Sequence, residues 1–386
     1  MKVVHWNMRY YPLLGGIETH VDTLIRHMPD IQFEIVTDAL PGTARTERYR
    51  PNATILRFPP VDRSRVSRHR KLSVPIAAIR DSLREARERK YLRSAEYDLL
   101  HVHDFDKNLL LMEDRTRLRF VGRLAGRLHN LQDFPRPRLL TKHFMFTEEN
   151  AVPALRKWEE RLVKQFETVV CVDKAIERRY SALEGPKRVL FIPNPIDTQQ
   201  FSFAPLPEDE TIHLGYVGRL AMARGENLLV DLSHSLPSGT DLRMAVPHPG
   251  DRLADVKKAL GGTRVQMELD VPYDSMPKFL QGIHILVNPI ADAYSTTRVT
   301  LESMAVGRPV IMFNTGERYP MRHGGNGFLV NPDVQSICRL VESVKSDRES
   351  LERISKKARE DVEKEFAAPL IASKIRRLYG ELTGSA

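Results

Sequence analysis

Residues Leu286–Val330 read LVNPIADAYSTTRVTLESMAVGRPVIMFNTGERYPMRHGGNGFLV. This order of residues predicts a buried strand, a short polar loop, a helix that carries Glu302, a second buried strand and a glycine-rich turn. Strands that alternate with helices indicate a parallel sheet with helices on both faces. The segment therefore predicts the α/β class.

The rest of the chain repeats this alternation of short apolar runs and helical patterns. We expect strands in the first half at Lys2–Asn7, Phe33–Thr37, Thr54–Phe58, Asp98–His103, Arg119–Leu124 and Thr168–Val172. We expect strands in the second half at Ile212–Val217, Asp241–Ala245, Arg264–Met267, His284–Asn288 and Pro309–Phe313. The turn-forming residues Pro-Asn-Pro at 193–195 lie between the two series, so the predicted domains are residues 1–195 and 196–368.

The length and composition agree with two domains. A chain of 386 residues is too long for one ordinary core and fits two α/β domains. No run approaches the roughly 18 apolar residues of a spanning helix, and the amino terminus is too polar for a signal-peptide core. Cys171 and Cys338 lie far apart without CxxC spacing. We therefore expect neither a disulfide nor a zinc site, and a cytoplasmic location.

The excess of positive over negative charge is confined to the first half of the chain. Residues 1–190 hold 36 Lys and Arg against 25 Asp and Glu, an excess of +11 that is larger than the +9 of the whole chain. A solvated arginine-rich surface explains this excess as well as attraction to a phosphorylated acceptor or to an anionic membrane leaflet does. Nucleic acid is not expected as a partner, because no nucleic-acid-binding motif accompanies the charge.

Two glycine-containing turns follow predicted strands. Residues 214–225 read LGYVGRLAMARG, in which Gly218 ends a strand and Arg219 and Arg224 follow it. Glycine lets a ligand approach the backbone, and two arginines can neutralise a diphosphate. Near the amino terminus, LGGIE places Gly15 and Gly16 before a helix, where backbone N–H groups can bind an anion. Each turn is also explained by a simple strand–helix connection.

A helix is expected from just before Arg298 to about Ala305, capped by Ser295, Thr296 or Thr297. The N–H groups at its start can bind a phosphate, and Glu302 lies toward the same side. The residues around Glu302 are apolar, so we expect it less to be an ordinary surface glutamate of the helix.

Two histidines end predicted strands or follow them. His103 ends DLLHVH and His129 follows RFVGRLAGRL, where a histidine is either a structural residue or a ligand contact. We expect His101 to point to the face of the sheet opposite to that of His103.

Six short motifs occur in order along the chain: GGIE, HVH, IPN-x-ID, GRL-x-x-x-RG, ESMA-x-G-x-P and NG-x-L-V. This series resembles the retaining glycosyltransferases of family four, which have the GT-B fold. The resemblance implies two Rossmann-like, doubly wound parallel-sheet domains that face a central cleft. It also implies that the amino-terminal domain binds the acceptor, that the second domain binds a nucleotide sugar, and that a carboxyl-terminal helix at 369–386 packs back on the first domain.

The resemblance assigns roles to individual residues. Arg219 and Arg224 would hold the donor diphosphate and stabilise it as the leaving group, and Glu302 would accept hydrogen bonds from the ribose hydroxyls. Tyr294 stands where the family usually has a glutamate that contacts the transferred sugar. The residues that would contact donor or acceptor are Gly15, Gly16, His103, His129, Gly218, Ser295, Thr296 and Thr297.

The expected activity is transfer of a sugar, with retention, from a UDP- or GDP-sugar to a hydroxyl of a sugar, lipid-linked or small-molecule acceptor. The resemblance implies no obligatory cofactor and no metal. Two alternatives stay open: a nucleotide-sugar epimerase of the same architecture, and a sugar-nucleotide-binding protein that has lost transfer, as Tyr294 allows. The expected location is cytoplasmic. The positive charge of the first half also allows peripheral attachment to the inner face of a membrane.

Overall fold

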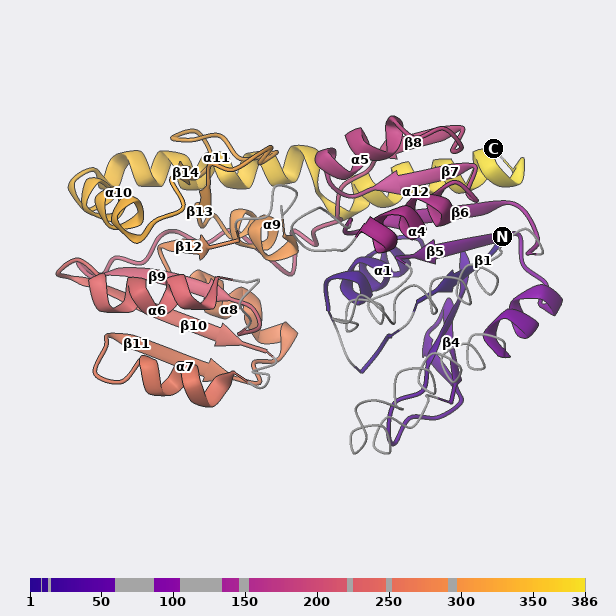
Figure 1. Cartoon of the computed structure of the whole chain (residues 1–386), viewed down its shortest axis with the longest axis horizontal. Coiled ribbons are helices and arrows are strands. Elements are labelled where there is room, and N and C mark those ends of the chain that lie inside the picture. The colour runs from indigo at the N-terminus through magenta and orange to yellow at the C-terminus, as the bar shows by residue number, and fades with distance from the viewer. Residues whose placement is uncertain are drawn as a thin grey trace. The chain divides into compact units, whose positions relative to one another are not determined.

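The structure is a computed structural model of the chain and describes residues 1–7, 9–12, 15–59, 87–104, 134–145, 153–220, 225–247, 252–290 and 297–385. The chain divides into two compact units (Figure 1). The first unit contains Met1–Pro193 and Ala372–Ala386, and the second contains Asn194–Ile371. Each unit is built around one sheet.

The first unit contains an eight-stranded sheet in which all neighbouring strands are parallel except β3 and β4. In spatial order the strands are β3 (Thr46–Arg50), β4 (Ala53–Phe58), β2 (Gln32–Asp38), β1 (Lys2–Trp6), β5 (Leu99–His103), β6 (Arg138–Lys142), β7 (Thr168–Cys171) and β8 (Arg188–Phe191). Strand β6 was not predicted from the sequence, and the predicted strand Arg119–Leu124 lies outside the described residues.

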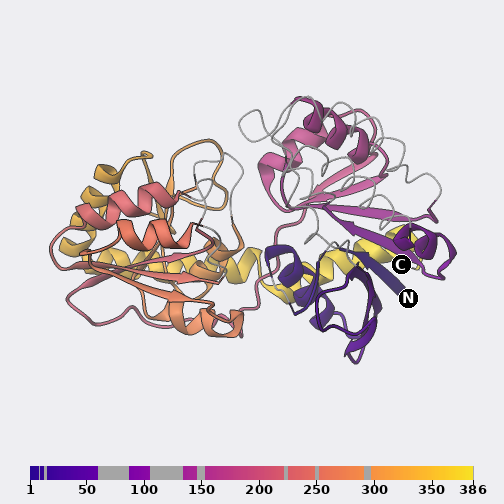
Figure 2. The same cartoon turned by 60° about the horizontal axis from the view of Figure 1, so that its bottom comes forward.

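Helices and the carboxyl terminus complete the first unit. Its helices are α1 (Gly16–Arg26), α4 (Pro153–Val163), α5 (Lys174–Ser181), residues 87–94 and the end of α12 (Ala368–Thr383). Side chains of α12 are fully buried here, including Ile375 and Tyr379. The two chain termini lie side by side (Figure 2), and the Thr383 hydroxyl lies 3.7 Å from the Met1 sulfur.

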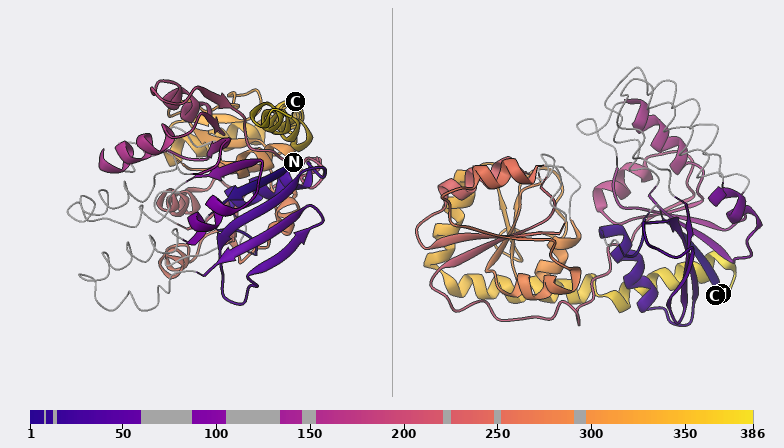
Figure 3. Two further views of the ribbon diagram at one scale, coloured as in Figure 1. Left: turned by 90° about the vertical axis from the view of Figure 1, so that its right-hand side faces the viewer. Right: turned by 90° about the horizontal axis from the view of Figure 1, so that it is seen from below.

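The second unit contains a six-stranded, all-parallel sheet with helices on both sides (Figure 3, right). In spatial order its strands are β11 (Val265–Leu269), β10 (Thr240–Val246), β9 (Ile212–Val217), β12 (Ile285–Asn288), β13 (Val310–Phe313) and β14 (Phe328–Val330). Its helices are α6 (Glu226–Ser235), α7 (Leu253–Ala259), the 3-10 turn η3 (Tyr273–Ser275), α8 (Met276–Gln281), α9 (Arg298–Ala305), α10 (Val334–Ser346) and α11 (Arg348–Glu365).

The strands of the second unit have continuous apolar sequences because both faces of their sheet are buried. In β12, Ile285 and Val287 belong to the core on one face of the sheet, whereas Leu286 belongs to the core on the other face. Successive strand residues point to opposite faces, and here both faces are covered. The predicted α/β class with two parallel sheets is therefore confirmed.

Candidate functional site

The strand order of the second unit reverses between β9 and β12, which are hydrogen-bonded neighbours. Ligands of open α/β sheets bind at the carboxyl ends of strands at such a reversal. Gly218 follows β9, and its N–H donates to the Ala245 carbonyl over 3.1 Å. The Tyr216 hydroxyl donates to the Arg219 carbonyl over 2.8 Å. The turn is thus held by the protein itself, while the Arg219 side chain is exposed.

Helix α9 begins at Arg298, whereas the sequence predicted a start just before this residue, and its start lies close to the carboxyl end of β12. Thr297 is its N-cap residue, with extended backbone and no side-chain cap hydrogen bond. The Asn288 amide at the end of β12 donates to the hydroxyls of Thr297 over 3.3 Å and Thr300 over 3.0 Å. These bonds fix the start of α9 at the sheet edge where the predicted phosphate site lies.

Glu302 is buried in α9 and makes two short hydrogen bonds. Its Oε1 accepts from the Tyr273 hydroxyl over 2.6 Å and from Arg298 Nε over 2.8 Å. Arg298 is also buried and donates to the Pro195 carbonyl over 2.8 Å. Burial and the carboxylate raise the pKa of Tyr273, and the pKa of Arg298 is raised because Tyr273 and Glu302 outweigh its burial. Glu302 is therefore paired with two side chains of its own unit.

In the first unit the strand order reverses between β1 and β5. Gly15 is the N-cap residue of α1, and its N–H donates to the Glu18 carboxylate over 3.0 Å. The helix thus supplies an acceptor for this amide from its own first turn. Gly16 is the first residue of α1, and a Cβ placed there meets no atom within 4 Å. The space over Gly16 is open.

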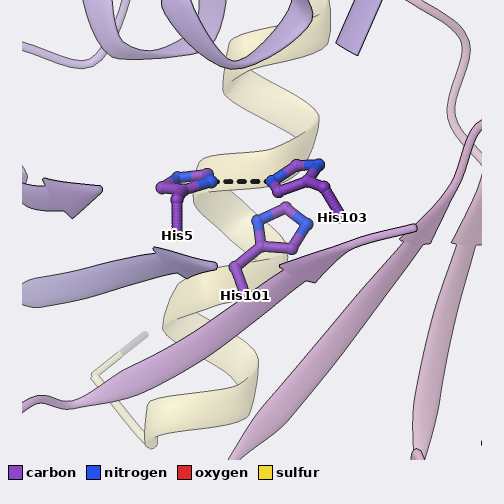
Figure 4. Close-up of side chains that lie close together, drawn as sticks. All are labelled: His5, His101 and His103. Atoms are coloured by element: carbon purple, nitrogen blue, oxygen red, sulfur yellow. Dashed lines mark hydrogen bonds between the residues drawn. The ribbon is translucent and has the colours of Figure 1, made fainter. Parts of the chain in front are cut away.

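His103 lies at the end of β5 within a cluster of histidines. Figure 4 shows His5, His101 and His103 pointing toward one another in front of α12. His5 Nδ1 and His103 Nε2 are 2.7 Å apart and share a hydrogen bond. The other nitrogen of His103, Nδ1, lies 3.3 Å from Nε2 of His143, which follows β6. Burial lowers the pKa of His5 to about 3 and holds the pKa values of His101 and His103 well below 6.5, so these rings are neutral at pH 7.

The expectation for His101 is wrong. The rings of His101 and His103 have centroids 4.1 Å apart and so lie on one face of the sheet. Residues i and i+2 of a strand share a face, because side chains alternate with a period of two. His101 Nδ1 contacts the Tyr379 hydroxyl and its Nε2 contacts the Thr141 hydroxyl, both at 2.7 Å. This histidine links β5 to α12 and β6.

A buried ion cluster lies at the carboxyl ends of β5 and β6. Lys142 Nζ lies 2.7 Å from Asp104 and 3.0 Å from Glu159, and all three side chains are at most 3% exposed. The two carboxylates outweigh burial and raise the pKa of Lys142. The second oxygen of Asp104 accepts from the backbone N–H groups of His143 and Phe144 at 2.9 and 3.2 Å. Asp104 therefore holds the backbone that carries His143.

Sequence reasoning missed His143. The strand before it, RLLTK, ends in two polar residues and was not predicted, although all five of its residues are buried. Lys142 is buried because two carboxylates neutralise its charge. The sequence of this strand therefore looks more exposed than the strand is in the fold. A histidine also stands at the end of β5, and this recurring position at strand ends could have pointed to His143. Five predicted site residues lie outside the described residues: His129, Arg224, Tyr294, Ser295 and Thr296.

Family comparisons match both units. Residues 14–200 match the family described as Glycosyltransferase Family 4, and residues 211–347 match the family described as Glycosyl transferases group 1.

Two curated proteins share a segment with the chain. An exopolysaccharide phosphotransferase of Streptomyces coelicolor is 27% identical over 153 residues, which are 38% of this chain and 16% of that protein. A sulfoquinovosyl transferase of Arabidopsis thaliana is 29% identical over 154 residues, 39% of this chain and 29% of that protein. The matches therefore span less than a third of either relative.

Solved structures resemble the whole chain. Sucrose-phosphate synthase from Thermosynechococcus elongatus aligns with a TM-score of 0.77 and 18% identity over 100% of both chains. HepE of Anabaena, solved in complex with UDP-glucose, aligns with a TM-score of 0.70 and 17% identity, over 99% of this chain and 100% of that chain. At these identities the likeness establishes the fold, which is GT-B.

Proposed function

Because this chain belongs to the family 4 glycosyltransferases and has the GT-B fold, we propose that it transfers a sugar from a nucleoside-diphosphate sugar to an acceptor hydroxyl. The observation that carries the proposal is the sheet edge of the second unit. There Gly218 and Arg219 follow β9, and α9 starts beside the end of the neighbouring strand β12. A helix amino terminus next to a cation suits the binding of a diphosphate.

The second unit is proposed to bind the donor. Arg219, whose side chain is exposed, contacts the diphosphate together with Arg224 and stabilises the charge that develops on it as the bond to the sugar breaks. Glu302 accepts hydrogen bonds from the ribose hydroxyls. Its pairing with Arg298 and Tyr273 supports this role, because the two hydrogen bonds hold the carboxylate in one orientation.

The first unit is proposed to bind the acceptor. His143 is half-buried, follows the strand next to β5, and has its backbone N–H held by Asp104. We propose His143 as the strand-end histidine that contacts a sugar hydroxyl. His103 is 2% exposed and is better suited to orienting His143 than to reaching a substrate. His129 keeps the role proposed from the sequence.

The donor is proposed to be a UDP- or GDP-sugar, with UDP-glucose the first to test because the structurally similar HepE has been solved with it. The reaction is proposed to retain the configuration of the anomeric carbon, with the departing phosphate taking the proton of the acceptor hydroxyl. No obligatory cofactor is proposed. The acceptor is proposed to be anionic or lipid-linked, on the basis of the +11 charge of residues 1–190.

Product analysis tests the proposed reaction. The purified chain is incubated with UDP-glucose and GDP-mannose, with and without candidate acceptors, and the sugar nucleotides are separated by chromatography. Free nucleoside diphosphate together with a glycosylated acceptor is the expected outcome. Accumulation of an epimer would instead identify an isomerase, and donor binding without turnover would identify a binding protein.

Two variants, one at Glu302 and a control at Glu226, test the donor site. Glu302→Gln keeps the shape of the side chain, loses its charge, and is expected to weaken UDP binding at least about tenfold, since a charge-assisted hydrogen bond contributes about 1.5–3 kcal/mol. Glu226→Gln serves as the control, because Glu226 is also a buried helix glutamate paired with an arginine, Arg252, in the same unit. Equal UDP affinities of the two variants and the parent would contradict the assignment of Glu302.

The proposed location is cytoplasmic, at the inner face of a membrane. Among the described residues, no helix has both the length and the apolar character needed to cross a bilayer. Binding to neutral and anionic vesicles at two salt concentrations tests the association. Binding only to anionic vesicles, reduced by salt, is expected; equal binding to both kinds of vesicle would contradict it.

A further inference from the structure

Histidines gather in the first unit to an unusual extent. Five of the 13 histidines of the chain lie together: His5 in β1, His20 in α1, His101 and His103 in β5, and His143 after β6. The first four are at most 2% exposed and His143 is half-buried. Two groups of three have ring nitrogens within 4.8 Å of one another: His5, His101 and His103, and His20, His103 and His143.

The inner group is a hydrogen-bonded network. Two imidazole nitrogens bound to one tetrahedral zinc-class ion lie about 3.3 Å apart, because each metal–nitrogen bond is about 2.0–2.1 Å long. His5 Nδ1 and His103 Nε2 are only 2.7 Å apart and must share a proton. Both nitrogens of His101 are also bonded, to Tyr379 and Thr141. The inner group therefore does not fit a metal ion.

In the outer group, two histidines have the spacing of metal ligands and the third lies within 4.8 Å of both. His103 Nδ1 and His143 Nε2 are 3.3 Å apart, the separation expected of two ligands on one ion. The ring of His20 stands at 90° to that of His143 with centroids 4.7 Å apart, and at 64° to that of His103 with centroids 5.7 Å apart. We propose that His20, His103 and His143 form a binding site for a divalent transition-metal ion of the zinc class.

The inner network accommodates the tautomer of His103 that a metal ion at Nδ1 requires. When Nδ1 of His103 keeps its lone pair, Nε2–H donates to His5 Nδ1. His5 Nε2–H then faces the Tyr379 hydroxyl at 3.4 Å, and that hydroxyl donates to His101 Nδ1. The series ends where His101 Nε2–H donates to the Thr141 hydroxyl. Every member then has a donor matched to an acceptor, as is usual for the second nitrogen of a metal-bound histidine.

The chemistry of the site follows from its ligands. Three imidazole ligands suit zinc, cobalt, nickel or copper, whereas magnesium and calcium require oxygen ligands. Three protein ligands leave a fourth position for water or for an oxygen of a bound molecule. Because His143 is partly exposed, an ion can reach the site from the side of this residue. The site shares His143 with the proposed acceptor contact, so an ion bound there and an acceptor hydroxyl would compete for this side chain.

Metal titration of the tag-free protein tests the site. After treatment with EDTA and dialysis, Zn²⁺ is added in a calorimeter, and Co²⁺ is added with its visible absorption recorded as a report on tetrahedral coordination. We expect one ion per chain, and we expect His20→Gln and His143→Gln each to weaken Zn²⁺ binding at least about tenfold. Mg²⁺ should not bind at this position.

His234→Gln is the matched control, because His234 is an exposed histidine in the second unit. The variant should bind Zn²⁺ as the parent does. Melting temperatures in EDTA establish that each variant is folded; if His20→Gln fails to fold, the half-buried His143 decides the question. Absence of Zn²⁺ binding to the parent, or binding unchanged in a folded His143→Gln variant, would overturn the proposal.

Discussion

Arg298 Nε donates to Oε1 of Glu302 over 2.8 Å, and the two buried side chains lie one turn apart in α9. Arg298 is the first residue of the helix, where the helix dipole disfavours a positive charge. The carboxylate of Glu302, the carbonyl of Pro195 and the hydroxyl of Tyr273 offset that cost. Arginine and glutamate at these positions are therefore energetically coupled.

The coupling predicts that Arg298→Met leaves Glu302 as a buried, unbalanced charge. Stability should fall by about 3–5 kcal/mol, the usual cost of removing one partner of a buried ion pair. Urea unfolding followed by circular dichroism measures the loss. The double variant Arg298→Met/Glu302→Gln should recover part of it, because no charge then stays unpaired. A single variant as stable as the parent would show that Glu302 is not held by Arg298.

In the first unit, Lys142→Met should be strongly destabilising. The change leaves the carboxylates of Asp104 and Glu159 without the cation that both contact. We expect a loss of about 3–5 kcal/mol in urea unfolding. Arg377→Met is the control: Arg377 is 77% exposed and lies 3.7 Å from Glu381, so its removal should change stability little. Similar losses from the two variants would contradict the buried ion cluster.

Gly218→Ala tests how tightly the turn after β9 is packed. A Cβ at this position would lie 2.7 Å from the Tyr216 hydroxyl, and the ring of Tyr216 is buried in the core. We expect a loss of about 1–3 kcal/mol from the forced shift of the ring, together with weaker UDP binding. Gly16→Ala is the matched control, since a Cβ there meets no atom within 4 Å. Equal melting temperatures of the two variants would contradict this packing.

Stability is expected to fall in mild acid, partly because of His284. Its Nδ1 accepts from the His213 N–H, and its Nε2–H donates to the Pro207 carbonyl, so the neutral ring satisfies both contacts. Burial, with nearby His213 and Arg348, lowers its pKa to about 4 from about 6.5 in the unfolded chain. Between these values the unfolded state takes up a proton that the folded state does not, so stability declines as the pH falls through this window.

The measurement is urea unfolding at pH 7.5 and pH 4.5. His284→Gln should lose about 1–3 kcal/mol less stability between the two values than the parent does. His234→Gln, which changes an exposed histidine of the same unit, should leave the pH dependence as it is. If the His284 and His234 variants respond alike, His284 does not carry this part of the acid sensitivity.

The sequence by itself determined the α/β class and many of the central elements. The strand predicted at Ile212–Val217 has the same bounds in the structure, and α9 ends at Ala305 as predicted. Both segments can be read locally, because the strand is a continuous apolar run and the helix follows capping residues. Strand β6 was missed because its buried Lys142 is neutralised by residues distant in the chain.

Only the tertiary structure decided which side chains meet. Glu302 was predicted as a ribose contact, but nothing local shows that Tyr273, 29 positions earlier, bonds to it. The histidine cluster joins residues of β1, α1, β5 and the end of β6, and Tyr379 reaches it from α12, 278 positions from His101. Local patterns report burial and backbone preference. Contacts between strands depend on register and on strand order, which are set when the whole sheet forms.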